Sequence, residues 1–272
     1  MDRYGVMGYP VSHSRSPVIH RLFAQQTGQE LQYELLQVSP EKLEPAVRQF
    51  QKTGGKGLNI TVPHKSEVTR LVDQLSERAS TAGAVNTLTF KEGEILGDNT
   101  DGFGLLRDLV VNQELALEGA NILVLGAGGA TRGIIGPFLE MQPASLHIAN
   151  RTLGKAQALA DYFSRSGPVT ASRFDTVPAK EKYSLIINAT SAGIHGETPP
   201  YPADTVSAET VCYDLSYGLK PTPFSTWARE HGAARSLMGW GMLVEQAAES
   251  FRIWRGVSPN TTEVLKRMTI NA

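Results

Sequence analysis

The run Ile122-Leu123-Val124-Leu125 leads directly into Gly126-Ala127-Gly128-Gly129, and this junction constrains the fold more than any other segment. Four consecutive apolar residues predict a strand with both faces buried, which is typical of a central strand in a parallel sheet. Glycines directly after such a strand allow a tight turn, and residues 131–141 are helix-like. The sequence therefore predicts a doubly wound α/β unit that starts at Asn121.

Strand-like and helix-like segments alternate along most of the chain, and no repeat, low-complexity tract or long linker interrupts them. The strand-like runs cover residues 4–7, 33–38, 58–62, 85–90, 122–125, 146–149, 185–189 and 211–215. The helix-like stretches cover residues 16–27, 40–52, 65–71, 103–112, 131–141, 154–165 and 241–255. This alternation predicts α/β layers around largely parallel sheets, in two units that meet near Asp101.

The last helix-like stretch has apolar residues at helical spacing, among them Val244, Ala247 and Phe251. A helix with such a face needs a partner surface, so we expect the tail to pack back against the first unit. The predicted organisation is one domain over residues 1–101, completed by residues 240–272, and a second over residues 102–239.

Composition excludes several classes of function. The formal net charge of -1 provides no field for nucleic acid or an anionic membrane. No apolar run approaches the length that crosses a bilayer, and the N-terminus lacks the pattern of a signal peptide. Cys212 is the only cysteine, which excludes an intramolecular disulfide and a cysteine metal cluster. We therefore expect a cytoplasmic protein that binds small molecules.

The glycine-rich turn has the position of a dinucleotide-binding loop. Gly126 and Gly128 would allow the backbone to approach a pyrophosphate, whose charge the following helix N-terminus would stabilise. Thr131 stands where the third glycine of G-x-G-x-x-G usually falls, so the match is imperfect. A purely structural glycine turn is the alternative interpretation.

The residues after the next strand indicate which dinucleotide would bind. A protein that prefers NAD usually has Asp or Glu about 20 residues after the loop. Here the strand at 146–149 ends in Asn150, Arg151 and Thr152, with Lys155 one helical turn later. Arg and Lys would attract a ribose 2′-phosphate that a carboxylate would repel, so the cluster favours NADP(H) over a solvated helix cap.

Two segments of the first half could supply an acid–base pair for reduction of a ketone. Lys65 follows the strand-like Asn59-Ile-Thr-Val-Pro-His and is expected at the start of the next helix. Asp101 lies in Asp98-Asn-Thr-Asp-Gly102, at the junction of the two units. A lysine can donate the proton and a carboxylate can orient it, and neither needs a metal. The alternatives are a solvated lysine and an aspartate that caps a helix.

At these residues the chain resembles the shikimate dehydrogenase family. Asn59-Ile-Thr-Val-Pro-His-Lys65 and Asn99-Thr-Asp-Gly102 look like its two signature segments, and Gly8-Tyr-Pro-Val-Ser-His-Ser-Arg-Ser-Pro17 resembles its N-terminal substrate loop. The similarity continues in Gly83-Ala-Val-Asn-Thr87, Asn188-Ala-Thr-Ser191 and Gly241-Met-Leu-Val-Glu-Gln-Ala247. These segments occur in order over nearly the whole chain.

The resemblance implies an N-terminal substrate domain, a Rossmann-like NADP domain, and reversible reduction of 3-dehydroshikimate to shikimate by NADPH in aromatic amino-acid biosynthesis. It implies that Lys65 and Asp101 form the catalytic pair, with Lys65 as proton donor and acceptor. The substrate-binding residues that it implies are Ser14, Ser16, Thr61, Asn86, Tyr217 and Gln246. Such neutral donors and acceptors suit a polyhydroxylated ligand.

The cofactor-binding residues carried over are Gly126, Gly128, Gly129, Ala130, Asn150, Arg151, Thr152, Lys155, Thr190, Ser191 and Gly239. One position departs from the family pattern. The family usually has Asp-Gly before the C-terminal helix, whereas this chain has Met238 followed by Gly239. The turn should survive, but Met238 cannot make the contacts of an aspartate.

Three other interpretations are weighed against this one. A quinate/shikimate dehydrogenase with NAD or either cofactor is disfavoured by Arg151 and Thr152, and Ser14 with Ser16 favours the biosynthetic type. A catalytically silent NADPH-binding protein would not need an intact acid–base pair. A Rossmann methyltransferase is disfavoured because its cofactor has no 2′-phosphate for residues 150–152. The sequence leaves monomer and homodimer open.

Overall fold

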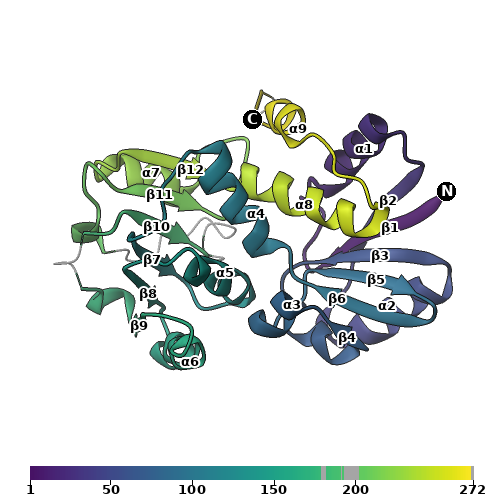
Figure 1. Ribbon diagram of the computed structural model, residues 1–272, viewed down its shortest axis with the longest axis horizontal. Helices are drawn as coiled ribbons and strands as arrows, with labels where there is room; N and C mark the ends of the chain where they lie inside the picture. The colour runs from purple at the N-terminus through teal and green to yellow at the C-terminus, as the bar shows by residue number, and fades with distance from the viewer. Residues whose placement is uncertain (179–181, 191, 193–201, 271–272) are drawn as a thin grey trace.

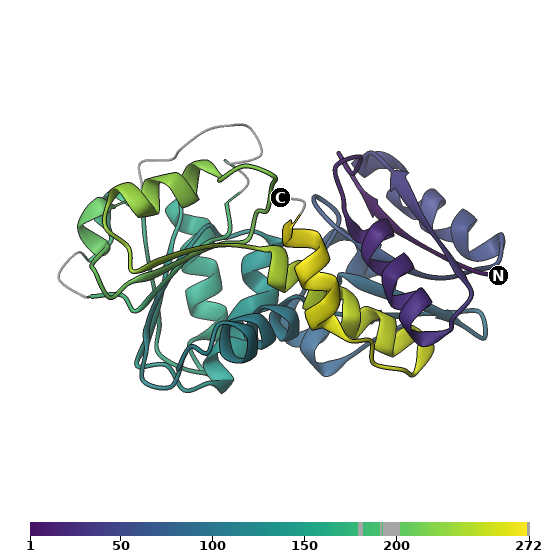
Figure 2. The same ribbon diagram turned by 90° about the horizontal axis from the view of Figure 1, so that it is seen from above.

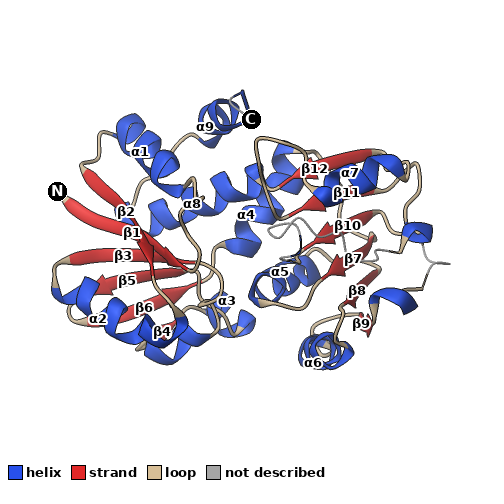
Figure 3. Cartoon of the chain, turned by 180° about the vertical axis from the view of Figure 1, so that it is seen from behind, coloured by secondary structure: helices blue, strands red, loops and turns tan. Residues whose placement is uncertain are grey.

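The computed structural model describes residues 1–178, 182–190, 192 and 202–270, and these form two lobes, each built on one six-stranded sheet (Figure 1). We call the lobe with strands β1–β6 the first lobe and the lobe with strands β7–β12 the second lobe. Figure 3 shows the strands gathered into these two sheets, with helices α4 and α8 between them. The predicted α/β class is therefore confirmed.

The first sheet has the strand order β2-β1-β3-β5-β6-β4. Its strands are β1 (Asp2–Gly8), β2 (Leu31–Gln37), β3 (Gly55–Ile60), β4 (Gln74–Leu75), β5 (Thr87–Lys91) and β6 (Glu94–Asp98). Its helices are α1 (Ser16–Thr27), α2 (Leu43–Lys52) and α3 (Glu77–Ala82), with short 3₁₀ helices at Pro40–Lys42 and Glu67–Leu71.

The expectation of largely parallel sheets is wrong for part of the first lobe. Strand β5 is antiparallel to both of its neighbours, β3 and β6. Glu92 and Gly93, which join β5 to β6, have φ angles of 54° and 90°. Positive φ at both positions of a two-residue turn is typical of a tight hairpin, so the chain reverses here without a crossover helix.

The second sheet is parallel throughout, in the order β12-β11-β10-β7-β8-β9. Its strands are β7 (Asn121–Leu125), β8 (Ser145–Ala149), β9 (Val169–Ser172), β10 (Leu185–Asn188), β11 (Val211–Asp214) and β12 (Arg235–Met238). The helices α5 (Gly129–Glu140), α6 (Leu153–Phe163) and α7 (Pro223–Glu230) belong to this lobe, with short 3₁₀ helices at Phe174–Thr176 and Ala203–Thr205.

Strand β7 is central, as its apolar sequence predicts. Ile122 and Val124 pack into the hydrophobic cluster on one face of the sheet, and Leu123 and Leu125 pack into the cluster on the other. All four side chains are fully buried. Reading outward from β7, the strand order is that of the doubly wound dinucleotide-binding fold, with its switch point between β7 and β10.

Two helices join the lobes. Helix α4 (Asp101–Arg107) continues into a π-helical turn at Asp108–Asn112, and helix α8 (Trp240–Arg255) follows β12. Figure 2 shows α8 and the terminal helix α9 (Thr261–Ile270) beside α1. The Trp254 indole donates to the carbonyl of Leu88 at 3.0 Å, so the end of α8 contacts the first sheet. No helix in the described part of the chain has the length and apolarity needed to span a membrane.

Candidate active site

Lys65 and Asp101 lie in direct contact between the two lobes. The Lys65 Nζ donates to Asp101 Oδ2 at 2.6 Å, with side-chain exposures of 14% and 4%. Asp101 is the first residue of α4, where a carboxylate is favoured by the helix dipole. The site thus holds a partly accessible ammonium against a buried carboxylate.

The backbone at Lys65 differs from the sequence expectation. Lys65 lies in a turn, and only a short 3₁₀ helix at Glu67–Leu71 follows it. The carbonyl of Lys65 accepts a 2.8 Å hydrogen bond from the backbone N–H of Val85. The Lys65 carbonyl thus binds the segment before β5, and the neighbouring His64 carbonyl accepts from the Val68 backbone N–H at 2.9 Å.

Two buried amide side chains bind Asp101, one at its second carboxylate oxygen and one at its backbone. Asn86 Nδ2 donates to Asp101 Oδ1 at 2.8 Å, and Asn99 Oδ1 accepts from the Asp101 backbone N–H at 3.1 Å. Asn86 Nδ2 also lies 3.4 Å from Oε1 of Gln246, which comes from α8. The structure therefore gathers Lys65, Asp101, Asn86 and Gln246, from four different elements, into one polar cluster.

Hydroxyl groups form a second polar cluster nearby. Ser14 Oγ donates to Ser16 Oγ at 3.2 Å, at the start of α1. Burial raises the pKa of Tyr217, while hydrogen bonds with the Arg15 backbone and the Ser14 side chain act in the opposite direction. Tyr217 follows β11 in the second lobe, so both lobes contribute to these hydroxyls. Thr61 lies half-buried just after β3.

The glycine loop lies at the switch point of the second sheet. Gly126 has a φ of 111°, and a Cβ there would lie 2.9 Å from the carbonyl oxygen of Ala189. Glycine at 126 is thus required by the turn itself. Thr131, in place of the third glycine of the usual motif, is fully buried and donates to the Gly126 carbonyl at 3.0 Å. The imperfect motif therefore still closes the turn.

Gly128 has no such structural requirement. Its φ is -98°, and a Cβ at this position would meet no atom within 4 Å. It is the N-cap of the twelve-residue helix α5 and makes no side-chain cap, so the first N–H groups of the helix are open to an anion. The space at Gly128, which a larger side chain would occupy, lies in front of a helix N-terminus and fits a pyrophosphate. Gly129 and Ala130 follow in the first turn of α5.

The cationic residues after β8 also fit a phosphate. Arg151, Thr152 and Lys155 are exposed, and neither basic side chain has an ion pair with any residue in the described ranges. Asn150 is half-buried and donates from its side chain to the Thr152 carbonyl at 2.9 Å, which shapes the turn into α6. Arg151 and Lys155 lie near the end of β8, beside the glycine loop of the second sheet, and two such cations can hold a 2′-phosphate.

The remaining predicted cofactor residues follow β10 and β12. Thr190 donates its hydroxyl to Asn188 Oδ1 at 2.7 Å, and Gly239 precedes α8. Ser191 lies outside the described residues. Met238 is partly buried in the hydrophobic cluster that includes Trp240, so it makes an apolar contact where the family usually has a carboxylate.

Sequence reasoning gave no role to three residues that connect the two polar clusters. The Asn59 side chain donates to the Asn86 backbone carbonyl at 3.2 Å and to Ser250 Oγ at 3.0 Å, and its Oδ1 accepts from the Tyr33 hydroxyl. A polar residue in the otherwise apolar β3 was the available signal for Asn59. Tyr33 and Ser250 carried no such signal.

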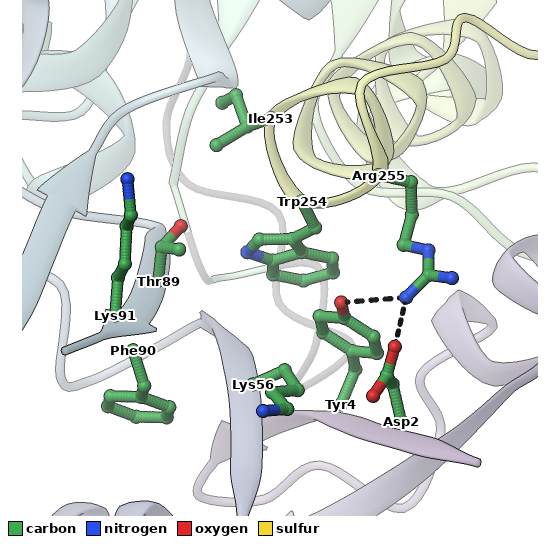
Figure 4. Close-up of a pocket in the computed structure, with 9 residues that line it drawn as sticks. All are labelled: Asp2, Tyr4, Lys56, Thr89, Phe90, Lys91, Ile253, Trp254 and Arg255. Atoms are coloured by element: carbon green, nitrogen blue, oxygen red, sulfur yellow. Dashed lines mark hydrogen bonds and ion pairs between the residues drawn. The ribbon is translucent and has the colours of Figure 1, made fainter. Parts of the chain in front are cut away.

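A separate pocket of about 320 Å³ lies where the end of α8 meets the first sheet (Figure 4). Tyr4, Trp254 and Arg255 are among its lining residues, and the pocket includes neither Lys65 nor Asp101. Figure 4 shows the Tyr4 hydroxyl and the Asp2 carboxylate both directed at the Arg255 guanidinium. This pocket is therefore distinct from the candidate active site.

Comparison with known proteins gives the same assignment over the whole chain. Residues 6–88 match the model of the shikimate dehydrogenase substrate binding domain, residues 109–195 match shikimate / quinate 5-dehydrogenase, and residues 239–269 match the shikimate 5′-dehydrogenase C-terminal domain. The shikimate dehydrogenase (NADP(+)) of Alkalilimnicola ehrlichii is 53% identical over 264 residues, which cover 97% of each chain.

Solved structures agree with these sequence matches. The crystal structure of an enzyme from Pseudomonas putida is 45% identical, covers 99% of this chain and 98% of its own, and has a TM-score of 0.91. The shikimate 5-dehydrogenase of Thermus thermophilus, solved with NADP(H) and shikimate, is 31% identical over 100% of both chains, with a TM-score of 0.87. The chain belongs to the shikimate dehydrogenase family.

Proposed function

We propose that this protein catalyses the reversible reduction of 3-dehydroshikimate to shikimate with NADPH, in the biosynthesis of aromatic amino acids. The observation that carries the proposal is the Lys65–Asp101 pair, held at 2.6 Å beside the nucleotide loop. A Cβ on Gly129 would lie 3.4 Å from the Cβ of Lys65. An acid–base group and a dinucleotide cradle in contact are what reduction of a ketone by a nicotinamide requires.

Lys65 is the proposed proton donor in the direction of reduction. Its ammonium would protonate the carbonyl oxygen as that oxygen gains negative charge, and the neutral amine would accept the proton in the reverse direction. Asp101 orients the ammonium through this bond, while Asn86 holds Asp101 in place. When bound, NADPH supplies the hydride.

The hydroxyl cluster is the proposed carboxylate site. Ser14, Ser16 and Tyr217 offer O–H donors close to one another, and a carboxylate accepts such bonds strongly. Thr61, Asn86 and Gln246 would bind the ring hydroxyls, since each carries a group that can donate or accept. Fixing both ends of a small ring in this way presents its ketone to Lys65.

The cofactor-binding proposal follows from the shape of the second lobe. Gly126, Gly128, Gly129 and Ala130 would receive the pyrophosphate at the N-terminus of α5. Arg151 and Lys155 would bind the 2′-phosphate, with Asn150 and Thr152 as further polar contacts. Thr190, Ser191 and Gly239 are proposed to approach the nicotinamide half.

The division into domains is proposed on the same basis. Residues 1–101, completed by residues 240–272, would bind the substrate, and residues 102–239 would bind NADP(H). We propose that the protein binds neither nucleic acid nor membrane and acts in the cytoplasm, since the buried, free Cys212 fits a reducing compartment. We propose that the protein acts as a monomer or a homodimer, the two states that the sequence leaves open.

A quinate/shikimate dehydrogenase with broader cofactor use is the second candidate, because one matching family model covers both substrates. Arg151 and Lys155, exposed and without ion partners among the described residues, favour NADP(H) instead. The test is to mix purified protein with NADPH and 3-dehydroshikimate, follow loss of absorbance at the nicotinamide band, and identify the product by NMR. Formation of shikimate supports the proposal, whereas no reduction of 3-dehydroshikimate would overturn it.

A further inference from the structure

The hydroxyl of Tyr33 has a place in the hydrogen-bond network that the proposed roles do not explain. Tyr33 comes from β2 at the edge of the first sheet, and its O–H donates to Asn59 Oδ1 at 2.7 Å. Asn59 is 6% exposed, so its carbonyl oxygen has little access to water. An acceptor buried in this way is costly to leave without a donor.

A continuous series of donors leads from Tyr33 to the catalytic pair. Asn59 Nδ2 donates to Thr87 Oγ1 at 3.3 Å, and Thr87 Oγ1 donates to Asn86 Oδ1 at 2.9 Å. Asn86 Nδ2 donates in turn to Asp101 Oδ1 at 2.8 Å. Every bond in the series points the same way, and the Tyr33 hydroxyl supplies the donor that the first acceptor, Asn59 Oδ1, requires.

Backbone groups fix which way the two amides face. Asn59 Nδ2 also donates to the Asn86 backbone carbonyl at 3.2 Å, and the Thr100 backbone N–H donates to Asn86 Oδ1 at 2.8 Å. Loss of the Tyr33 hydroxyl would leave Asn59 Oδ1 without this donor, so the Asn59 side chain would shift to find another partner. Because Asn59 Nδ2 binds both the Asn86 backbone and Thr87, such a shift would displace Asn86 and its bond to Asp101.

Tyr33 also meets the hydroxyl cluster at its other side. Burial raises the pKa of Tyr33 well above its usual value, and the side-chain hydrogen bond with Ser16 acts in the opposite direction. Because the only proton of Tyr33 goes to Asn59, its oxygen accepts from Ser16. If Ser16 donates its hydrogen bond to a bound carboxylate instead of to Tyr33, the bond from Tyr33 to Asn59 stays in place.

We propose that Tyr33 is a positioning residue, which acts through Asn59 and Asn86 to hold Asp101 and Lys65 in the geometry for proton transfer. The inference deepens the proposed function and depends on it. It assigns to an edge-strand tyrosine an effect on turnover, although its hydroxyl makes no hydrogen bond to Lys65 or Asp101.

Tyr4 provides a matched control. It lies directly opposite Tyr33 in the register of β1 and β2, and both rings lie near Trp254, with centroid distances of 4.7 Å for Tyr4 and 6.5 Å for Tyr33. The Tyr4 hydroxyl contacts Arg255 instead of the amide network (Figure 4). Tyr33→Phe and Tyr4→Phe thus each remove one hydroxyl from the same sheet and keep the ring.

The experiment measures kcat, KM and thermal stability for both variants with shikimate and NADP. For Tyr33→Phe we expect kcat to fall about 3- to 10-fold, the effect of one buried hydrogen bond, with KM for NADP within about 2-fold of wild type. For Tyr4→Phe we expect kcat within about 2-fold and a similar change in Tm. Unchanged kcat in Tyr33→Phe, or an equal fall in both variants, would overturn the role of Tyr33.

A double-mutant cycle with Asn86→Ala tests the route. If Tyr33 acts through Asn86, adding Tyr33→Phe to Asn86→Ala lowers kcat by less than about 2-fold further. A full additional fall would show that Tyr33 acts elsewhere. The wild-type rate separates the two claims: an inactive wild type overturns the proposed function and this inference together, whereas an active wild type with an unaffected Tyr33→Phe overturns only the inference.

Discussion

Gly129 lies against Lys65, so that a Cβ on the glycine would be 3.4 Å from the Cβ of the lysine. The first residue of α5 in the second lobe thereby lies against Lys65 of the first lobe, the proposed proton donor. Helix α4 fixes the same junction from the other side, since it begins at Asp101. The glycine loop, the lysine and the carboxylate are thus held together by the fold itself.

Replacement of Lys65 by alanine should abolish most turnover and spare the cofactor. We expect kcat to fall by about 10²- to 10⁴-fold, because the proton donor is lost, while NADPH binding measured by fluorescence stays nearly unchanged. Lys56→Ala, which removes an exposed lysine at the separate pocket, is the control and should retain wild-type kcat. Near-normal turnover in Lys65→Ala would show that another group transfers the proton.

Two glycines of the same loop should respond differently to alanine. Gly128→Ala places a methyl group in open space and should leave Tm nearly unchanged while raising KM for NADP by about 10-fold or more. Gly126→Ala forces a φ of 111° and a contact with Ala189, so it should lower the free energy of unfolding by about 1–3 kcal/mol. Thermal melts measure the loss of stability in each variant, and KM values measure the loss of cofactor binding. Unaffected NADP kinetics in Gly128→Ala would place the pyrophosphate elsewhere.

Arg151 should determine much of the preference for NADP over NAD. Arg151→Ala removes an exposed cation from the proposed 2′-phosphate site, and we expect kcat/KM with NADP to fall about 10-fold or more while the value with NAD changes little. Arg173→Ala serves as control, because Arg173 is exposed in the same lobe but already paired with Asp175 at 3.1 Å. If Arg151→Ala keeps the wild-type preference for NADP over NAD, as Arg173→Ala should, the 2′-phosphate binds at other residues.

Two buried histidines should make the fold sensitive to acid. Burial lowers the pKa of His20 to about 3 and that of His147 to about 4, from an ordinary value of 6.5. Below pH 6.5 the unfolded chain therefore binds protons that the folded chain refuses. Each histidine should lower the free energy of unfolding by about 1.4 kcal/mol per pH unit, down to its folded pKa.

His20→Phe tests this reasoning by urea unfolding at several pH values. The His20 ring stacks on the Tyr33 ring with their centroids 4.2 Å apart, so an aromatic replacement retains the contact and removes the titrating group. We expect the loss of stability between pH 6.5 and about 4 to become shallower by about one proton in His20→Phe than in wild type. Equal slopes for His20→Phe and wild type would contradict the assignment.

The sequence predicted those features that depend on local pattern. The apolar run of β7 and the glycines after it predicted the parallel second sheet, because a strand buried on both faces has few other solutions. The hairpin at Glu92 and Gly93 was missed, since its signal is only two residues long. The helix expected over residues 65–71 forms only as a 3₁₀ helix at Glu67–Leu71, and Lys65 itself lies in a turn whose carbonyl accepts a tertiary hydrogen bond from Val85.

Site residues divide in the same way. Lys65 and Asp101 stand in motifs and were predicted, and the structure brings them together. The network behind them depends on contacts between distant segments, such as Asn59 with Ser250, which are 191 positions apart. No local pattern in β2 distinguishes Tyr33 from any aromatic strand residue, so its connection to the site becomes visible only in three dimensions.

The most direct test of the account compares initial rates of nicotinamide reduction by wild-type protein with shikimate or quinate as substrate and NADP or NAD as cofactor. We predict fast reduction of NADP by shikimate, with kcat/KM for the other three pairs lower by about 10-fold or more. Comparable rates with quinate and NAD would instead indicate the broader enzyme. No turnover with any of the four pairs would contradict the account.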